Sequence, residues 1–166
     1  DYVRGYEDSK FLIYANSLLK SIVLSRNNTF SKRYIKFFSE NFDGFSVFIP
    51  RYLKPQEPPL TVYDKENNKM DPLAIEKASR YVSLIPFIED SHAFDFMPDC
   101  WCTDSQFLNL GFGDYEEHAI LLCNYFNFID AYQGKNIQSY LLLGKGHPEG
   151  KTIYVIRCNF ANNDYE

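Results

Sequence analysis

Apolar residues repeat at helical spacing at two places in the first half of the chain. Over about residues 9–24 they predict an amphipathic helix whose apolar face needs a partner. A second helix of about 13 residues is expected after Asp71, its predicted N-cap, with Pro72 at the first helical position and Pro86 just beyond the end.

Two more helices are predicted in the second half. A short one ends at Gly111 and has Thr103 or Asp104 as its cap. The next begins in the stretch GDYEEHAILLCNYF, which starts at Gly113. Its apolar spacing predicts one buried face, made of Ala119, Leu122, Cys123, Phe126 and Ile129.

Strand-like patterns occur at three places. Residues 45–49 alternate apolar and polar positions before Pro50, and residues 139–143 and 152–156 are apolar runs joined by the turn-rich stretch GKGHPEGK. The last two are expected to pair as an antiparallel hairpin. The pattern therefore predicts an α+β fold with helices packed on a small antiparallel sheet.

A proline-rich stretch divides the chain. Residues 50–59 contain four prolines and predict a semi-rigid connector. We expect a flanking segment over residues 1–49, which could be the tail of a preceding domain, and a main domain over residues 60–166 that is incomplete at its C-terminus. The chain opens on Asp1 without a signal-peptide pattern, so we expect it to be a segment of a longer protein.

Composition excludes several classes of function. The net charge of −5 gives no field that favours nucleic acid, and the basic run over residues 31–36 is expected to be a solvated helix face. No apolar run is long enough to span a bilayer, so no direct membrane insertion is expected. The four cysteines are expected to be reduced thiols, because the chain lacks secretory cues.

The candidate chemical motifs are weak. GKGHPEGKT lacks the glycine spacing of a phosphate loop, and the three histidines are too scattered for a metal triad. The acids Asp114, Glu116 and Glu117 are compatible with a cation site or an acid/base pair, but complementing the helix dipole explains them more simply. His118 and Cys123 are rotated by about 140° from each other on a helix, so they form no dyad. We assign no catalytic, cofactor or metal-binding residue from these motifs.

Several ordered blocks resemble a known family. They are RYVSLIPF (residues 80–87), CWCTDSQFLNLGFGDYEEHAILLCNYF (residues 100–126) and YLLLGKGHPEGKTIYV (residues 140–155). They resemble the transglutaminase-like domain of the ciliary coiled-coil and C2-domain protein family, which is found at the transition zone of the ciliary base. IPRYLKPQEPP (residues 49–59) resembles the connector that leads into that domain, whereas residues 1–44 resemble nothing known.

The resemblance implies a transglutaminase-like fold, related to papain-like cysteine proteinases, that is catalytically degenerate. In active members of that fold the nucleophilic cysteine usually stands four residues before a helix alanine, and this position holds Tyr115, four before Ala119. The position that resembles the catalytic histidine holds Thr152. Neither a phenol with its ordinary pKa of about 10 nor a threonine hydroxyl can replace these groups near neutral pH.

The resemblance further implies an inactive pseudoenzyme without a cofactor, located in the cytoplasm and the cilium. It would serve as a scaffold that supports assembly of the transition zone or the axoneme through contacts with other ciliary proteins, a microtubule-associated complex among them. The alternative is an active thiol hydrolase or acyl transferase that uses Cys100, Cys102 or Cys123 from a non-standard place. The sequence does not separate the ciliary base from the axoneme.

Overall fold

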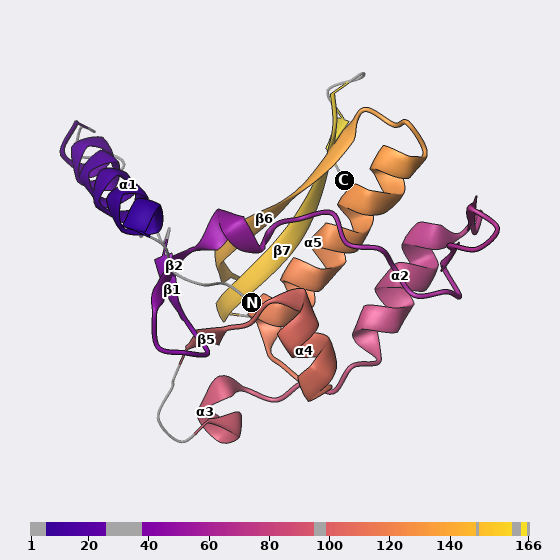
Figure 1. Ribbon diagram of the computed structural model, residues 1–166, viewed down its shortest axis with the longest axis horizontal. Helices are drawn as coiled ribbons and strands as arrows, with labels where there is room; N and C mark the ends of the chain where they lie inside the picture. The colour runs from indigo at the N-terminus through magenta and orange to yellow at the C-terminus, as the bar shows by residue number, and fades with distance from the viewer. Residues whose placement is uncertain (1–5, 26–37, 95–98, 149, 161–163, 166) are drawn as a thin grey trace.

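The computed structural model describes residues 6–25, 38–94, 99–148, 150–160 and 164–165 (Figure 1). Helices and short sheets are mixed, which confirms the α+β class. The elements, in chain order, are α1 (Tyr6–Ser25), β1 (Phe38–Asn41), β2 (Ser46–Phe48), the 3-10 helix η1 (Ile49–Tyr52), β3 (Tyr63–Asp64), β4 (Lys69–Met70), α2 (Ala74–Ser83), α3 (Asp90–Ala93), β5 (Cys100–Trp101), α4 (Asp104–Leu110), α5 (Tyr115–Tyr132), β6 (Ile137–Gly146), β7 (Gly150–Asn159) and β8 (Asp164–Tyr165).

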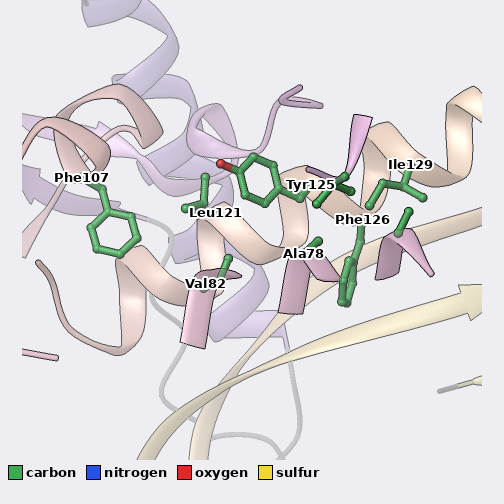
Figure 2. Packing of buried hydrophobic residues seen from close by; sticks show 9 residues of the cluster. Ala78, Val82, Phe107, Leu121, Tyr125, Phe126 and Ile129 are labelled. Carbon is green, nitrogen blue, oxygen red and sulfur yellow. The ribbon is translucent and has the colours of Figure 1, made fainter. Parts of the chain in front are cut away.

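Helix α5 is the centre of the fold. Figure 1 shows it between α2 on one side and the β6–β7 hairpin on the other. The core between α2 and α5 is built from buried apolar side chains, several of which face one another in Figure 2. They are Val62, Ala74, Ala78, Val82, Phe107, Leu121, Tyr125, Phe126 and Ile129. Burying a large apolar side chain of this kind stabilises a fold by about 1.5–3 kcal/mol.

A second core lies on the other side of the start of α5. Trp101 and Ile120 are almost completely buried there and pack with residues from β2 and η1. Tyr52 donates a hydrogen bond from its hydroxyl to the Trp101 carbonyl at 3.1 Å. Strand β2 and the start of the proline-rich connector thus pack directly against β5 and the first turns of α5.

The helix predictions from the second half are confirmed. Helix α4 has Thr103 as its N-cap, within a complete capping box with Gln106, and ends at Gly111 in the left-handed conformation with φ of 72°. The predicted buried face of α5 is also confirmed, with Leu122 partly buried and the other four residues buried. Local capping and periodicity were sufficient signals for both helices.

The predicted start of α2 is wrong by two residues. The helix begins at Ala74, with Leu73 as its N-cap residue, and it is ten residues long. Asp71 does accept a backbone hydrogen bond, but from Leu73 at 2.8 Å, so its side chain caps the turn that precedes the helix. The aspartate–proline signal therefore marks this turn.

The predicted hairpin is confirmed, and its strands are longer than expected. Strands β6 and β7 are ten residues each and pair antiparallel from Ile137 opposite Asn159 to Gly146 opposite Gly150. Side chains on the inner face, such as Leu141 and Ile153, pack against the second core. The outer face leaves Tyr140, Leu142 and Tyr154 exposed.

The sequence did not predict the small sheet with the strand order β2-β1-β5. Strand β1 pairs antiparallel with β2 and parallel with β5, so residues on both sides of the proline-rich connector meet in one sheet. The division of the chain at residues 50–59 stays a prediction.

The predicted first helix is confirmed as α1, which lies at one side of the molecule (Figure 1). Phe11 packs edge-on against Phe48, with 5.1 Å between ring centroids. None of the helices in the described part of the chain has the length and apolar character to cross a membrane. The basic run at residues 31–36 lies outside the described residues.

Candidate functional site at the start of helix α5

The first turn of α5 is fixed by a capping box. Asp114 is the N-cap and accepts a hydrogen bond from the Glu116 amide at 3.0 Å, while Glu117 accepts one from the Asp114 amide at 3.1 Å. Gly113 allows the close approach of α4, because a Cβ atom at this position would lie 2.7 Å from the Phe107 ring. The two carboxyl groups therefore have fixed positions at the start of the helix.

Acidic side chains in the same region accept hydrogen bonds from backbone amides in and just after strand β5. Glu117 accepts a second hydrogen bond, from the Cys102 amide at 3.1 Å, and Asp90 of α3 accepts one from the Cys100 amide at 2.6 Å. These acceptors satisfy amides that would otherwise be buried without a partner. Acidic side chains from α3 and α5 thus connect both helices to β5.

The acids at this site are buried. Asp90, Glu116 and Glu117 are exposed by 5%, 3% and 2%, and Asp114 is partly buried. The helix dipole therefore does not fully explain the acids. An acidic side chain at an exposed position in the first turn interacts favourably with the dipole, so this interaction gives no reason for burial. The backbone amides of β5 account for the burial of Asp90 and Glu117, but not for that of Glu116.

Burial makes these carboxyl groups harder to ionise. It raises the pKa of Asp90 and of Glu117, against the hydrogen bonds from the amides, which lower it. It also raises the pKa of Asp114, and the neighbouring Glu116 and Glu117 carboxyl groups act in the same direction. The cause is loss of hydration combined with repulsion between like charges.

One lysine reaches this cluster from the hairpin. Lys151 of β7 lies with its Nζ 3.3 Å from Glu116 Oε1 and remains largely exposed. Although partial burial acts to lower it, the pKa of Lys151 is raised by the surrounding carboxylates, Glu116 first. This ion pair holds the beginning of β7 against the first turn of α5.

Tyr115 and Thr152 are each next in sequence to one residue of that ion pair. Tyr115 precedes Glu116, and Thr152 follows Lys151. Tyr115 is the first residue of α5, is 48% exposed and packs edge-on against Phe87, with 4.7 Å between ring centroids. Thr152 is buried in β7, opposite Gly144. Because Glu116 contacts Lys151, the residues next to Tyr115 and Thr152 are in contact.

Two of the buried thiols, those of Cys102 and Cys123, are poor nucleophiles. All four cysteines are free, as expected, and Cys100, Cys102 and Cys123 are buried. A hydrogen bond with Cys100, together with burial and the nearby Glu117, raises the pKa of Cys102, and burial raises the pKa of Cys123 to about 12. Thiols activated for catalysis show the opposite shift.

His118 is used structurally. Its Nδ1 lies 2.6 Å from the Asp114 carbonyl oxygen and its Nε2 lies 3.0 Å from the Ile85 carbonyl oxygen. The ring also packs edge-on against Phe107, with 4.9 Å between centroids. His118 therefore connects the start of α5 to the segment after α2 and has no free nitrogen for proton transfer.

The roles of two buried polar residues of α5, Asn124 and Asp130, were not found from the sequence. Asn124 donates to the Tyr52 carbonyl at 2.8 Å and to Asp104 Oδ2 at 2.7 Å, and accepts from the Lys54 amide at 2.9 Å. Asp130 is fully buried and pairs with Arg157 of β7. A polar residue on the apolar face of a predicted helix indicates a buried polar contact. The partners could not be identified, because they are far away in sequence.

The comparisons with known proteins match the part of the chain that holds this site. Residues 99–165, from just before β5 into β8, match the family model described as the CEP76 peptidase-like domain. No solved structure matches the chain at a significant level. This stretch contains β5, α4, α5 and the β6–β7 hairpin.

A longer alignment extends beyond this domain. Over 153 residues the chain is 33% identical to Protein CC2D2B of Homo sapiens, and the alignment covers 89% of this chain. The chain belongs to the coiled-coil and C2 domain-containing protein family, of which CC2D2B is a member. It spans about a tenth of the length of this relative, since the alignment covers 10% of CC2D2B.

Proposed function

We propose that this domain has a transglutaminase-like fold, is catalytically inactive and acts as a scaffold in a ciliary protein. One observation carries the inactivity. Tyr115 occupies the first position of α5, where the resemblance places the nucleophilic cysteine, and Thr152 occupies the position of the histidine in β7. A Tyr–Thr pair supplies neither a thiolate nor a general base near neutral pH.

The surroundings of Tyr115 support the same conclusion. The acids Asp114, Glu116 and Glu117 lie at the N-cap and in the first turn of α5, and any of them that is ionised opposes the formation of a nucleophilic anion there. Tyr115 itself packs against Phe87 instead of facing a base. Among the described residues, no thiol forms a hydrogen bond with an imidazole.

The rival function, a thiol hydrolase that uses another cysteine, has no support in the geometry. Cys123 is fully buried in the third turn of α5, and its nearest polar contact is Asn127 Nδ2 at 3.6 Å from the sulfur. Cys100 and Cys102 are buried in and beside β5. A substrate carbonyl has no path to any of these three sulfur atoms without rearrangement of the core.

The ciliary part of the proposal rests on membership of the CC2D2B family and on the sequence resemblance. We propose that the whole protein is located in the cytoplasm at the cilium, either at the transition zone or along the axoneme, in a large assembly with other ciliary proteins. A microtubule-associated complex is one such assembly. The domain would contribute protein–protein contacts and no chemistry.

The inactivity can be tested with iodoacetamide at pH 6 and mass spectrometry of the intact chain. All three buried thiols should label slowly at similar rates, and the protein should not hydrolyse or transfer glutamine acyl groups in peptide substrates. The double variant Tyr115→Cys, Thr152→His is the matched comparison, because it restores the two reactive groups at the positions that the fold implies. Acyl transfer by the unsubstituted chain, or one buried thiol that labels far faster than the others, would contradict the proposal.

The ciliary role can be tested with the full-length tagged protein in ciliated cells. Accumulation at the ciliary base or along the axoneme is expected, and four variants with one cysteine each changed to serine should localise in the same way. Folding of each variant is checked by thermal melting of the purified chain. Absence from the cilium would contradict the location, and loss of ciliary assembly with a single, well-folded cysteine variant would contradict the inactivity.

A further inference from the structure

Three carboxyl groups from separate segments converge at the start of α5. Asp90 comes from α3, Asp114 from the turn after α4, and Glu117 from the first turn of α5. One carboxylate oxygen of each lies within 4.8 Å of the others. Asp90 and Glu117 are buried and Asp114 is partly buried, so little of the cluster is in contact with solvent.

A fourth carboxyl group, that of Glu116, lies beside Asp114 of this cluster and has an incomplete set of partners. Glu116 is 3% exposed, and its Oε1 is paired with Lys151. Its Oε2 is buried and has no hydrogen-bond partner among the described residues. The Glu116 carboxyl lies within hydrogen-bonding reach of the Asp114 carboxyl. A buried carboxylate oxygen without a donor is costly, and a bound cation supplies the missing partner.

Further charged groups lie close to the cluster. Asp99 adds a fifth carboxyl group near Asp90 and Lys151, and Lys151 contacts the group through Glu116. His118, next in sequence to Glu117, uses both ring nitrogens on carbonyl oxygens of the backbone. Carboxylates this close repel one another strongly when buried, so either shared protons or a cation must hold them together.

We propose that Asp90, Asp114 and Glu117 bind one divalent cation of the hard, oxygen-preferring class, with Glu116 completing the site. Carboxylate oxygens are the ligands that Ca²⁺ and Mg²⁺ prefer. Ca²⁺ fits better, because its ligands lie about 2.3–2.6 Å away and opposite ligands are therefore up to about 5 Å apart, whereas Mg²⁺ demands a tighter octahedron. The cation would join α3, α5 and the turn between α4 and α5.

The test uses the unsubstituted 166-residue chain and the metal alone. Tb³⁺ serves as a luminescent substitute for Ca²⁺, excited through Trp101, the only tryptophan of the chain, which lies in β5 between Cys100 and Cys102 in sequence. Saturable Tb³⁺ emission that Ca²⁺ displaces is expected, together with binding of one Ca²⁺ per chain in calorimetry. Thermal stability should rise with Ca²⁺ concentration, because the cation binds only the folded state.

Asp114→Asn and Asp90→Asn are the test variants. Asparagine caps a helix as well as aspartate does and keeps one carbonyl oxygen for the amide contacts, so both variants should fold. Each should weaken Ca²⁺ binding by at least about tenfold, as the loss of a charged ligand predicts. Asp71→Asn is the matched control, since Asp71 also precedes a helix and accepts a backbone amide but lies outside the cluster. Its affinity for Ca²⁺ should equal that of the unsubstituted chain.

Three results would overturn the proposal. The first is no saturable binding of Ca²⁺ or Tb³⁺ up to about 1 mM, the weak limit of protein Ca²⁺ sites. The second is equal weakening by Asp71→Asn and by the two cluster variants. The third is a higher melting temperature for both Asp90→Asn and Asp114→Asn, with no effect of Ca²⁺ on the melting temperature of any of the three chains. That result would show that shared protons hold the carboxyl groups together.

Discussion

Arg157 of β7 contacts both oxygens of the buried Asp130 carboxylate on α5 through two of its guanidinium nitrogens. Its Nη2 lies 2.9 Å from Oδ1 and 3.0 Å from Oδ2, and its Nε lies 3.3 Å from Oδ2. Asp130 is fully buried and the Arg157 side chain is 13% exposed. The guanidinium also lies 5.4 Å from the centre of the Phe126 ring. The far ends of the helix and the hairpin are thus joined by a charged contact within an apolar setting.

Asp130→Asn should lower the free energy of unfolding by about 3 kcal/mol, because it leaves the guanidinium buried without its counter-charge. Urea denaturation of both chains measures this difference. Lys65→Met is the control, since Lys65 pairs with Glu57 at 2.9 Å but both side chains are well exposed. The control should leave the denaturation midpoint unchanged. An Asp130→Asn midpoint equal to that of the control would show that the buried pair contributes nothing.

Asp104 should make stability depend on pH in mildly acidic solution. Burial raises its pKa to about 6, against the hydrogen bond from Asn124. The unfolded chain has the ordinary value of about 3.9, so the folded state binds more protons between about pH 4 and 6 and stability falls as the pH rises through this window. Asp104→Asn should remove a fall on the order of 1–2 kcal/mol, measured by urea denaturation at several pH values.

The control for Asp104 is an aspartate with the opposite shift. Hydrogen bonds from the Asn67 side chain and backbone lower the pKa of Asp64, so its stabilising contribution is present above the unfolded pKa and is lost as the pH falls. Asp64→Asn should therefore leave the fall between pH 4 and 6 in place. If the stability of Asp104→Asn still falls by the full amount between pH 4 and 6, the fall is due to the acids at the start of α5 and not to Asp104.

Local signals made the second half of the chain predictable. Thr103, Gly111 and the apolar runs of the hairpin each act within a few residues, so caps, helix ends and strands follow from the sequence alone. Asp71 shows the limit of such signals. The same side chain can cap a turn or a helix, and the choice depends on how the following residues pack.

The site itself was only partly predictable, because its partners are distant in sequence. The acids Asp114, Glu116 and Glu117 were found, but their burial was not, since Glu117 bonds to Cys102, 15 residues earlier. Asp90 gave no signal at all, because its role depends on the amide of Cys100 in a two-residue strand. Such short strands form through tertiary pairing, here with β1, and not through their own propensity.

Gly113 should tolerate no side chain. A Cβ atom there would lie 2.7 and 2.9 Å from two Phe107 ring atoms and 3.0 Å from Glu117 Cβ, so the ring or the first turn of α5 must shift. Gly113→Ala should lower the free energy of unfolding by about 1–3 kcal/mol, measured by urea denaturation. Gly144→Ala is the control, because a Cβ atom at Gly144 meets nothing within 4 Å. Equal stability of the two variants would contradict the close packing of α4 on α5.

His118 should stabilise the fold through its hydrogen bonds more than through its ring. Its nitrogens lie 2.6 Å from the Asp114 carbonyl oxygen and 3.0 Å from that of Ile85, and a ring N–H donates to the carbonyl oxygen that it faces. His118→Phe keeps the packing against Phe107 but removes the ring N–H donor, so a loss of about 1–3 kcal/mol is expected in urea denaturation. His92→Phe, at an exposed histidine, should cost nothing measurable. A His118→Phe variant as stable as the unsubstituted chain would reduce His118 to a packing residue.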